Sequence, residues 1–275
     1  MKCLNFKILL LLVLLLFAAF IACEEQTEWE LQKTEPFIVV DALITSEFKE
    51  QEIYVYSSSD TLNGSSMPIH DASIRIFDGS NYHSFVYSGK QGLYISEPFA
   101  GVINKKYALI INYKGVLDTS FAEMEPITPF KNDTLIYKDG LFQFLYGGSD
   151  SPAMTEIYYD WSVVPEYCTL YGSCSASNTF YTLNSLDAAK EFGSEKQEIW
   201  FPGGTTIIRR KYSLSDAHQD FVRSLLIETE WRGGLFDIEQ GNVPTNFKNG
   251  IRGWFAVCTV ISDTLLVNSE SDLRR

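Results

Sequence analysis

Residues 73–87 read SIRIFDGSNYHSFVY and carry the clearest structural signal of the chain. Polar and apolar side chains alternate over residues 73–77, which is the period of a half-buried strand. Asp78-Gly79-Ser80-Asn81 is a run of turn-forming residues, and the aromatic and apolar residues of 82–87 follow it. The stretch therefore predicts two antiparallel strands joined by a turn.

Similar strand-like segments lie on both sides of this hairpin. They cover residues 37–45, 53–56, 92–95, 105–113 and 116–121. About seven strands within about ninety residues is the spacing of an immunoglobulin-like β-sandwich, and because the Cys-Trp-Cys hallmark is missing, spacing alone supports this fold. Glu125-Pro126-Ile127-Thr128-Pro129 then interrupts any regular element. We expect an immunoglobulin-like β-sandwich over residues 36–125.

Residues 126–275 predict a β-rich C-terminal domain with one amphipathic helix. Strands are expected at 141–146, 157–164 and 205–212, and a closing strand at 251–261. The helix should begin after Ser213 or Ser215 and cover about 215–231, until Gly233-Gly234 ends it. Its apolar stripe consists of Phe221, Val222, Leu225 and Leu226. The fold class is therefore expected to be mainly β.

The bulk composition describes an acidic globular protein. Apolar residues make up 45% of the 275 residues and charged residues 21%, which disfavours disorder over most of the chain. The net charge is −13, whereas nonspecific nucleic-acid binding requires a positive surface, so no nucleic-acid partner is expected. The 5 cysteines are too few, in a chain this long, for a disulfide-framework miniprotein.

The N-terminal residues have the organisation of an export signal. Lys2 and Lys7 accompany an uninterrupted apolar run over residues 8–22, which is shorter than a membrane-spanning helix and has the length of a signal-peptide core. The run ends in Phe20-Ile21-Ala22-Cys23, which resembles the bacterial lipobox. In a lipobox the cysteine is lipidated and becomes the first residue after cleavage. The alternative is an ordinary cleaved signal peptide followed by a free thiol.

Residues 1–22 are therefore expected to be a lipoprotein signal peptide, and residues 23–35 an acidic tether. Lipidated Cys23 would carry more than one acyl chain, which is sufficient for stable attachment to a lipid bilayer. Glu24, Glu25 and Glu28 follow closely and resemble the surface-export signal of Bacteroidota lipoproteins, with a plain solubilising linker as the alternative. The expected location is the outer membrane, lipid-anchored and facing the cell surface.

The sequence offers little catalytic chemistry. It contains no G-x-S-x-G, Walker, G-x-G-x-x-G or H-E-x-x-H motif. The only histidines are His70, His83 and His218, and none of their spacings suits a metal site. Asp216 and Asp220 fall in the first turns of the expected helix, where the positive helix end favours acids. We expect no catalytic residues, no metal site, no cofactor and no enzymatic activity.

Two groups of residues are candidates for covalent modification. Cys168 and Cys174 flank a turn-like segment and are expected to form a disulfide in an exported protein, with Cys258 left as a buried thiol. Three Asp-Thr-Leu segments resemble the O-glycosylation site of Bacteroidota exported proteins. Their candidate acceptors are Thr61, Thr134 and Thr264.

Two further segments have expected structural roles. Arg209 and Lys211 would share one face of a strand, where they meet either an acidic partner or local acids on a solvated surface. Residues 243–255 are expected to form a structural clasp, in which Gly250 and Gly253 permit positive φ. Because Trp254 and Phe255 point to opposite faces of a strand, one should enter the core while the other lies outside or against a neighbouring element.

Several segments together resemble one family. Cys23 with its acids, followed by PFIVVDALIT at 36–45, resembles the start of domain-of-unknown-function family 4249, and IHDASIRIFD at 69–78 is similar to its "pv.gA.V.i.d" strand. The C-terminal part of the family, in which a helix precedes a "vptNi.gglGyF.a" segment, is similar to YSLS at 212–215, the helix, VPTNF at 243–247 and GIRGWF at 250–255. Phe247 and Arg252 depart from that pattern. The resemblance covers nearly the whole mature chain and implies a Bacteroidota outer-membrane lipoprotein, often encoded beside a TonB-dependent transporter. It supplies no catalytic residues.

These observations favour an accessory lipoprotein that works with a TonB-dependent outer-membrane transporter in nutrient capture or uptake. A stand-alone surface adhesin or binding protein is the alternative, and co-purification with a large β-barrel discriminates the two. A hydrolase with an unrecognised carboxylate site is the third hypothesis. The sequence does not identify the ligand.

Overall fold

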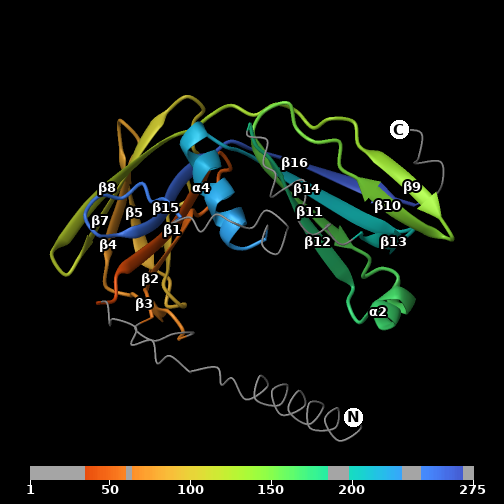
Figure 1. Ribbon diagram of the computed structural model, residues 1–275, viewed down its shortest axis with the longest axis horizontal. Helices are drawn as coiled ribbons and strands as arrows, with labels where there is room; N and C mark the ends of the chain where they lie inside the picture. The colour runs from red at the N-terminus through yellow and green to blue at the C-terminus, as the bar shows by residue number, and fades with distance from the viewer. Residues whose placement is uncertain (1–34, 60–63, 185–197, 231–242, 269–275) are drawn as a thin grey trace, which may run out of the picture. The chain divides into compact units, whose positions relative to one another are not determined.

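All the strands expected in the N-terminal half are present in the structure, a computed structural model that describes residues 35–59, 64–184, 198–230 and 243–268 (Figure 1). Residues Pro36–Arg275 form one unit, separate from Met1–Glu35. The N-terminal strands are β1 (Ile38–Thr45), β2 (Glu52–Ser57), β4 (Ser73–Phe77), β5 (Tyr82–Tyr87), β6 (Leu93–Ser96), β7 (Lys106–Tyr113) and β8 (Val116–Glu123), together with the short, unpredicted β3 (Met67–Pro68).

The hairpin of residues 73–87 forms as predicted. Strands β4 and β5 are antiparallel, with Ile74 opposite Phe85, and both of these side chains are buried. The Asp78 carboxylate closes the turn by accepting the backbone N–H groups of Ser80 and Asn81, at 2.8 Å each. This is the local bonding that makes Asp a favoured turn residue.

The N-terminal sheet closes on itself. Its strand order is β15-β1-β2-β6-β5-β4-β7-β8, with β3 paired to β2. Strand β15 (Arg252–Cys258) pairs in parallel with β1 and also contacts β8, so the two ends of the order meet. The inward side chains of these strands form a single core, in which Phe255 is fully buried. The expectation of a mainly β first half is confirmed.

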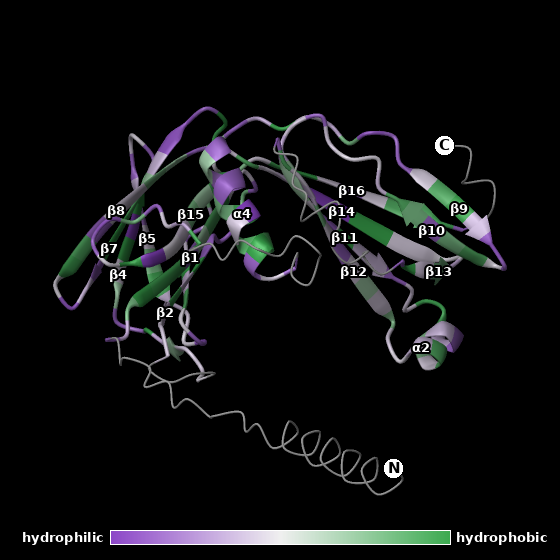
Figure 2. Ribbon diagram, in the orientation of Figure 1, coloured by the Kyte–Doolittle hydropathy of each residue, from purple (hydrophilic) through white to green (hydrophobic). Residues whose placement is uncertain are grey.

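The second half contains two smaller sheets. One has the order β12-β11-β14-β16 and the other the order β13-β10-β9. Their strands are β9 (Thr134–Lys138), β10 (Leu141–Leu145), β11 (Ala153–Asp160), β12 (Ser175–Thr182), β13 (Trp200–Pro202), β14 (Thr205–Ser213) and β16 (Val260–Val267). Side chains from both sheets, among them Phe142, Tyr159, Phe201 and Ile207, share one core. Figure 2 shows apolar residues concentrated in the strands of both halves.

The amphipathic helix is α4 (Asp216–Glu228). Its start agrees with the prediction, because the Ser215 hydroxyl accepts the backbone N–H of His218 at 3.4 Å and caps the helix. Val222 and Leu226 are buried, whereas Leu225 is 40% exposed, so the buried stripe is narrower than expected. The helix ends at Glu228, before Gly233-Gly234, which lies outside the described residues.

The expected closing strand at 251–261 is two strands. β15 completes the first sheet, β16 joins β14 in the second half, and Thr259 lies between them. The backbone N–H of Thr259 is bonded to the Ser213 hydroxyl and its own hydroxyl to the Glu125 carbonyl, which fixes the crossing point. A boundary at residue 126 therefore does not separate two independent domains, because residues 252–258 belong to the first sheet.

The second half also differs from the prediction in local detail. The strand expected at 157–164 is β11, which covers Ala153–Asp160. Ser162 donates its backbone N–H to the Asp160 carboxylate, so the chain turns there and enters the short helix α2 (Pro165–Tyr171). Neither this helix nor β9, β12 and β13 was predicted.

Candidate functional site

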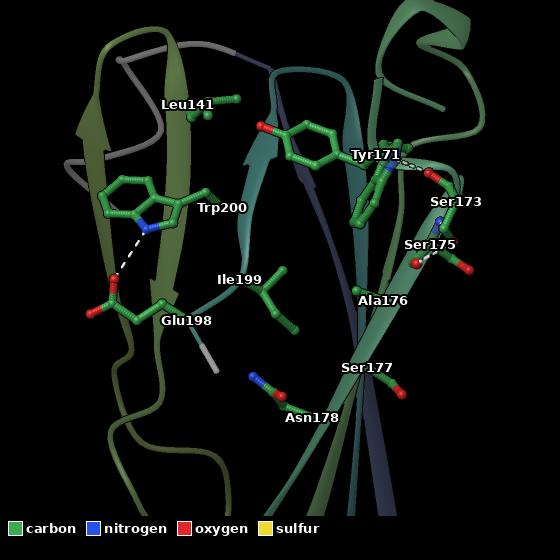
Figure 3. A pocket seen from close by; sticks show the side chains of 11 residues that line it. Leu141, Tyr171, Ser173, Ser175, Ala176, Ser177, Asn178, Glu198, Ile199 and Trp200 are labelled. Atoms are coloured by element: carbon green, nitrogen blue, oxygen red, sulfur yellow. Dashed lines mark hydrogen bonds between the residues drawn. The ribbon is translucent and has the colours of Figure 1, made fainter. Parts of the chain in front are cut away.

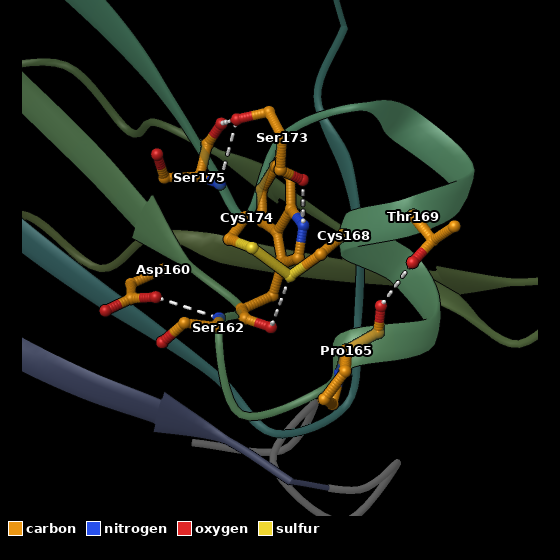
Figure 4. Close-up of a disulfide and its surroundings, with 9 residues drawn as sticks. Asp160, Ser162, Pro165, Cys168, Thr169, Ser173, Cys174 and Ser175 are labelled. Carbon is orange, nitrogen blue, oxygen red and sulfur yellow. Dashed lines mark hydrogen bonds between the residues drawn. A yellow bond between two sulfur atoms is a disulfide. The ribbon is translucent and has the colours of Figure 1, made fainter.

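The predicted disulfide joins Cys168 and Cys174 (Figure 4). It fastens helix α2, which carries Cys168, to Cys174, the residue directly before β12. The turn is also fixed by the Trp161 indole, whose Nε1 donates to the Ser173 carbonyl at 2.9 Å. Two exposed apolar side chains lie at this turn: Leu170 is 72% exposed and Tyr171 is 52% exposed.

A cavity of about 460 Å³ lies where β12, the disulfide-bonded turn and the residues leading into β13 meet (Figure 3). This volume falls within the range of small-molecule sites, about 300–1,000 Å³. Part of its wall is apolar and consists of Leu141, Trp161, Ala176 and Ile199. The cavity therefore combines a size suitable for a ligand with partly apolar walls.

Two aromatic rings line the mouth of this cavity. Figure 3 shows the Tyr171 ring extending from the turn towards Trp200. The Trp200 indole is held by its edge, because Nε1 donates to Glu198 Oε2 at 3.1 Å. The two rings therefore belong to separate elements. The hydrogen bond that fixes Trp200 uses only the N–H group at the edge of the indole ring.

The polar groups of the cavity are largely free to bind. Asn178 lies on β12 and lines the cavity, yet its amide makes no hydrogen bond with any described residue. The Tyr171 hydroxyl likewise has no partner in the described part of the chain. Among the described residues that line the cavity, Glu198 is the only charged one, and none carries a positive charge. The site offers hydrogen-bond donors and acceptors without a cation.

The basic pair predicted on one strand face is buried and does not form a solvated surface. Arg209 on β14 is 6% exposed and forms ion pairs with Asp133 and Asp263. Its guanidinium also lies 4.3 Å from the centre of the Phe130 ring. The two carboxylates satisfy a buried charge that would otherwise be costly, so Arg209 has a structural role.

Lys211, two residues further, is fully buried as well. Its ammonium donates to the Pro129 carbonyl at 2.7 Å, and burial lowers its pKa. Arg210 points to the opposite face and pairs with Glu47, which lies between β1 and β2. The predicted alternative, in which the basic residues pair with local acids, is correct for Arg209, but the pairing lies in the interior of the protein and not on a solvated surface.

The structure places two of the three candidate glycosylation residues on strand surfaces. Thr134 begins β9 and Thr264 lies on β16, and both are exposed. The aspartates that precede them are the two partners of Arg209, which gives these Asp-Thr-Leu segments a structural function. Thr61 lies outside the described residues.

His218 and Cys258 form a contact that the sequence did not predict. His218 Nδ1 lies 3.8 Å from the Cys258 sulfur. Burial lowers the pKa of His218 to about 4 and raises the pKa of the Cys258 thiol to about 12. Both groups are therefore neutral near pH 7, and this pair lacks the thiolate that a cysteine nucleophile requires. Cys258 is the buried thiol that was expected.

The two helix acids do not form a site. The Asp216 carboxylate accepts the Gln219 side-chain amide at 3.1 Å, within the first turn of α4. Among the described residues, no group of three or more His, Cys, Asp or Glu side chains could hold a metal ion. In the same part of the chain no helix is long and apolar enough to span a membrane. Cys23 lies outside the described residues.

The closing segment has the expected clasp geometry. Gly250 and Gly253 have φ values of +88° and +99°. The Asn246 side chain binds both the N–H and the carbonyl of Phe255, at 3.0 and 2.7 Å. Phe255 enters the first core, while Trp254 packs on α4, with its ring 4.8 Å from that of Phe221. The prediction that one aromatic is a core residue and the other meets a neighbouring element is confirmed.

Comparison with known proteins identifies a family and distant structural likenesses. No curated protein matches the chain. Among solved structures, the FN1–FN3 domains of chicken CNTN1 are 11% identical over 66% of this chain, with a TM-score of 0.28. The chain spans 64% of that structure. The model of the family described as "Domain of unknown function (DUF4249)" matches residues 24–264, which is most of the chain, and the protein therefore belongs to the DUF4249 family.

Proposed function

We propose that the protein is an outer-membrane lipoprotein that assists a TonB-dependent transporter by capturing a nutrient beside the pore. The observation that carries the proposal is the export signal, an apolar run over 8–22 that ends in Phe20-Ile21-Ala22-Cys23 and is followed by acids. Lipidated Cys23 would hold residues 36–275 at the membrane surface.

The proposed role requires binding and no catalysis. Anchoring a binding protein next to a pore replaces free diffusion by a high effective concentration of substrate. The cavity beside β12 supports this role, because it has the volume of a ligand site and polar groups that no described residue binds.

Two measurements on cells test the anchor and its orientation. Cys23→Ala should abolish labelling of the protein by a fatty-acid analogue, whereas Cys3→Ala, a matched change ahead of the apolar run, should not. Externally added protease should digest the wild-type protein on intact cells, because the proposed orientation faces outward. Undiminished labelling of Cys23→Ala, or full protection from protease until the outer membrane is opened, would contradict this part of the proposal.

Co-purification tests the partnership. The tagged wild-type protein, extracted in mild detergent, should bring down one TonB-dependent β-barrel in stoichiometric amount. Deletion of that barrel should abolish uptake of the same nutrient whose uptake is weakened by loss of the lipoprotein. A protein that is anchored and exposed but purifies alone would instead support the stand-alone adhesin.

A further inference from the structure

We propose that the cavity beside β12 binds a neutral carbohydrate. The inference names the substrate class for the capture role and rests on that proposed function for its biological setting. The binding itself depends only on residues of the cavity, so it is measured without a transporter.

The position of Asn178 indicates a ligand. Alternate residues of a strand point to the same face, and the neighbours of Asn178 on its face, Ala176 and Phe180, pack against the core of the second half. Asn178 itself is half-buried, so its amide is open to a ligand that enters from the solvent. That amide has no hydrogen-bond partner among the described residues and faces the cavity, where it offers one acceptor and two donor hydrogens.

The aromatic rings fit the apolar faces of a sugar. A pyranose ring carries C–H groups on its two faces and hydroxyl groups around its edge. Trp200 and Tyr171 supply flat, partly exposed surfaces for the C–H groups. Asn178, the Tyr171 hydroxyl and the free oxygen of Glu198 supply partners for the hydroxyl groups at the edge.

The charge of the cavity selects against other ligand classes. No Lys, Arg or His is among the described residues that line it, so none of these residues compensates the charge of a phosphate, sulfate or carboxylate ligand. A cation is the competing class, because Glu198 and the aromatic rings could attract one. However, one Glu198 oxygen already accepts the Trp200 N–H, so the carboxylate also serves to position the indole.

The disulfide prepares the site for binding. It holds the turn that carries Tyr171 and Ser173 against the start of β12, and the Trp161 indole bonds the same turn. A wall that is fixed before the ligand arrives loses less conformational freedom on binding. The disulfide therefore serves to hold one wall of the cavity in place before the ligand binds.

The test is calorimetric titration of the full chain, purified in detergent, with maltohexaose, cellohexaose, xylohexaose, laminarihexaose and N-acetylchitohexaose. At least one should bind saturably. Trp200→Ala and Asn178→Ala should each weaken that binding at least tenfold, whereas Tyr158→Ala, an exposed aromatic on β11 outside the cavity, should leave it unchanged. Unfolding curves verify that the variants fold. If Trp200→Ala does not fold, the binding measured with Asn178→Ala decides whether the cavity is the binding site.

The carboxylate separates the two ligand classes. Glu198→Gln keeps an acceptor for the Trp200 N–H, so it should weaken sugar binding only a few-fold. Spermidine is the cationic probe, and it should bind more weakly than the best sugar. Absence of binding by all five oligosaccharides, equal binding by Asn178→Ala and the wild type, or tight spermidine binding that Glu198→Gln abolishes would each overturn the inference. None of these results would affect fatty-acid labelling or co-purification, so the proposed function is judged separately.

Discussion

Replacing Gly253 should destabilise the protein more than any other single added methyl group in the closing segment. Gly253 lies on β15 opposite Val40 of β1, with φ at +99°. A Cβ at this position would overlap the carbonyl oxygen of Val40 and approach its carbonyl carbon and nitrogen. These are backbone atoms inside a strand pair, so they cannot move aside as a flexible side chain would.

The expected magnitude has two parts. Positive φ costs a residue with a Cβ about 1–2 kcal/mol. Displacing β1 to relieve the overlap adds about 1–3 kcal/mol, the usual range when extra atoms are forced into a filled site. Gly253→Ala should therefore lower the free energy of unfolding by about 2–5 kcal/mol, most of the stability of a marginal fold.

Gly250→Ala is the matched control. Gly250 also has positive φ, at +88°, but a Cβ there would meet nothing within 4 Å. The control should show only the conformational cost, about 1–2 kcal/mol. Urea unfolding followed by tryptophan fluorescence measures both variants. Equal destabilisation by the two changes would refute the close approach of β15 and β1 as the reason for glycine at 253.

Three further changes test other features. Phe255→Ala removes a fully buried ring and should lower the free energy of unfolding by about 3–5 kcal/mol, seen as a lower unfolding midpoint and reduced abundance in cells. A Trp254→Ala or Phe255→Ala variant that melts like the wild type, yet no longer co-purifies with a transporter, would favour an interface over a clasp. Cys168→Ser opens a short loop and should cost about 2 kcal/mol by loop-closure entropy, with peptide mass spectrometry of the unreduced wild type checking the bond. Burial lowers the pKa of His218 to about 4, so the neutral side chain stabilises the fold fully above its ordinary pKa, and this stabilisation is lost as the pH falls towards 4. The free energy of unfolding should therefore drop by roughly 1 kcal/mol between about pH 7.5 and about pH 5.5. His218→Gln should flatten this dependence, and an unchanged slope would contradict it.

Local chemistry made part of the fold predictable. The hairpin of residues 73–87 combines alternating side chains with a turn whose aspartate bonds its own backbone, and both signals lie within one short segment. The start of α4 was predictable for the same reason, because the Ser215 cap and the apolar stripe are adjacent in sequence.

The features that were missed depend on distant partners or weak patterns. β12 reads SASNTFYT, which lacks a clear apolar alternation, yet it pairs along its whole length with β11. The split at Thr259 was hidden inside a largely apolar stretch, and only the bonds of Thr259 to Ser213 and Glu125 explain the crossing. The cavity has no sequence signature, since it requires β12, the disulfide-bonded turn and Trp200 to converge.

The parallel pairing of β1 with β15 has a consequence for biosynthesis. β15, the neighbour of β1 in the finished sheet, is synthesised more than two hundred residues after β1. Until then the backbone groups along one side of β1 remain unpaired, which is the condition under which chains associate edge to edge. A chaperone that shields this strand until the C-terminal residues arrive would therefore raise the yield of folded protein more than one acting on the later sheets.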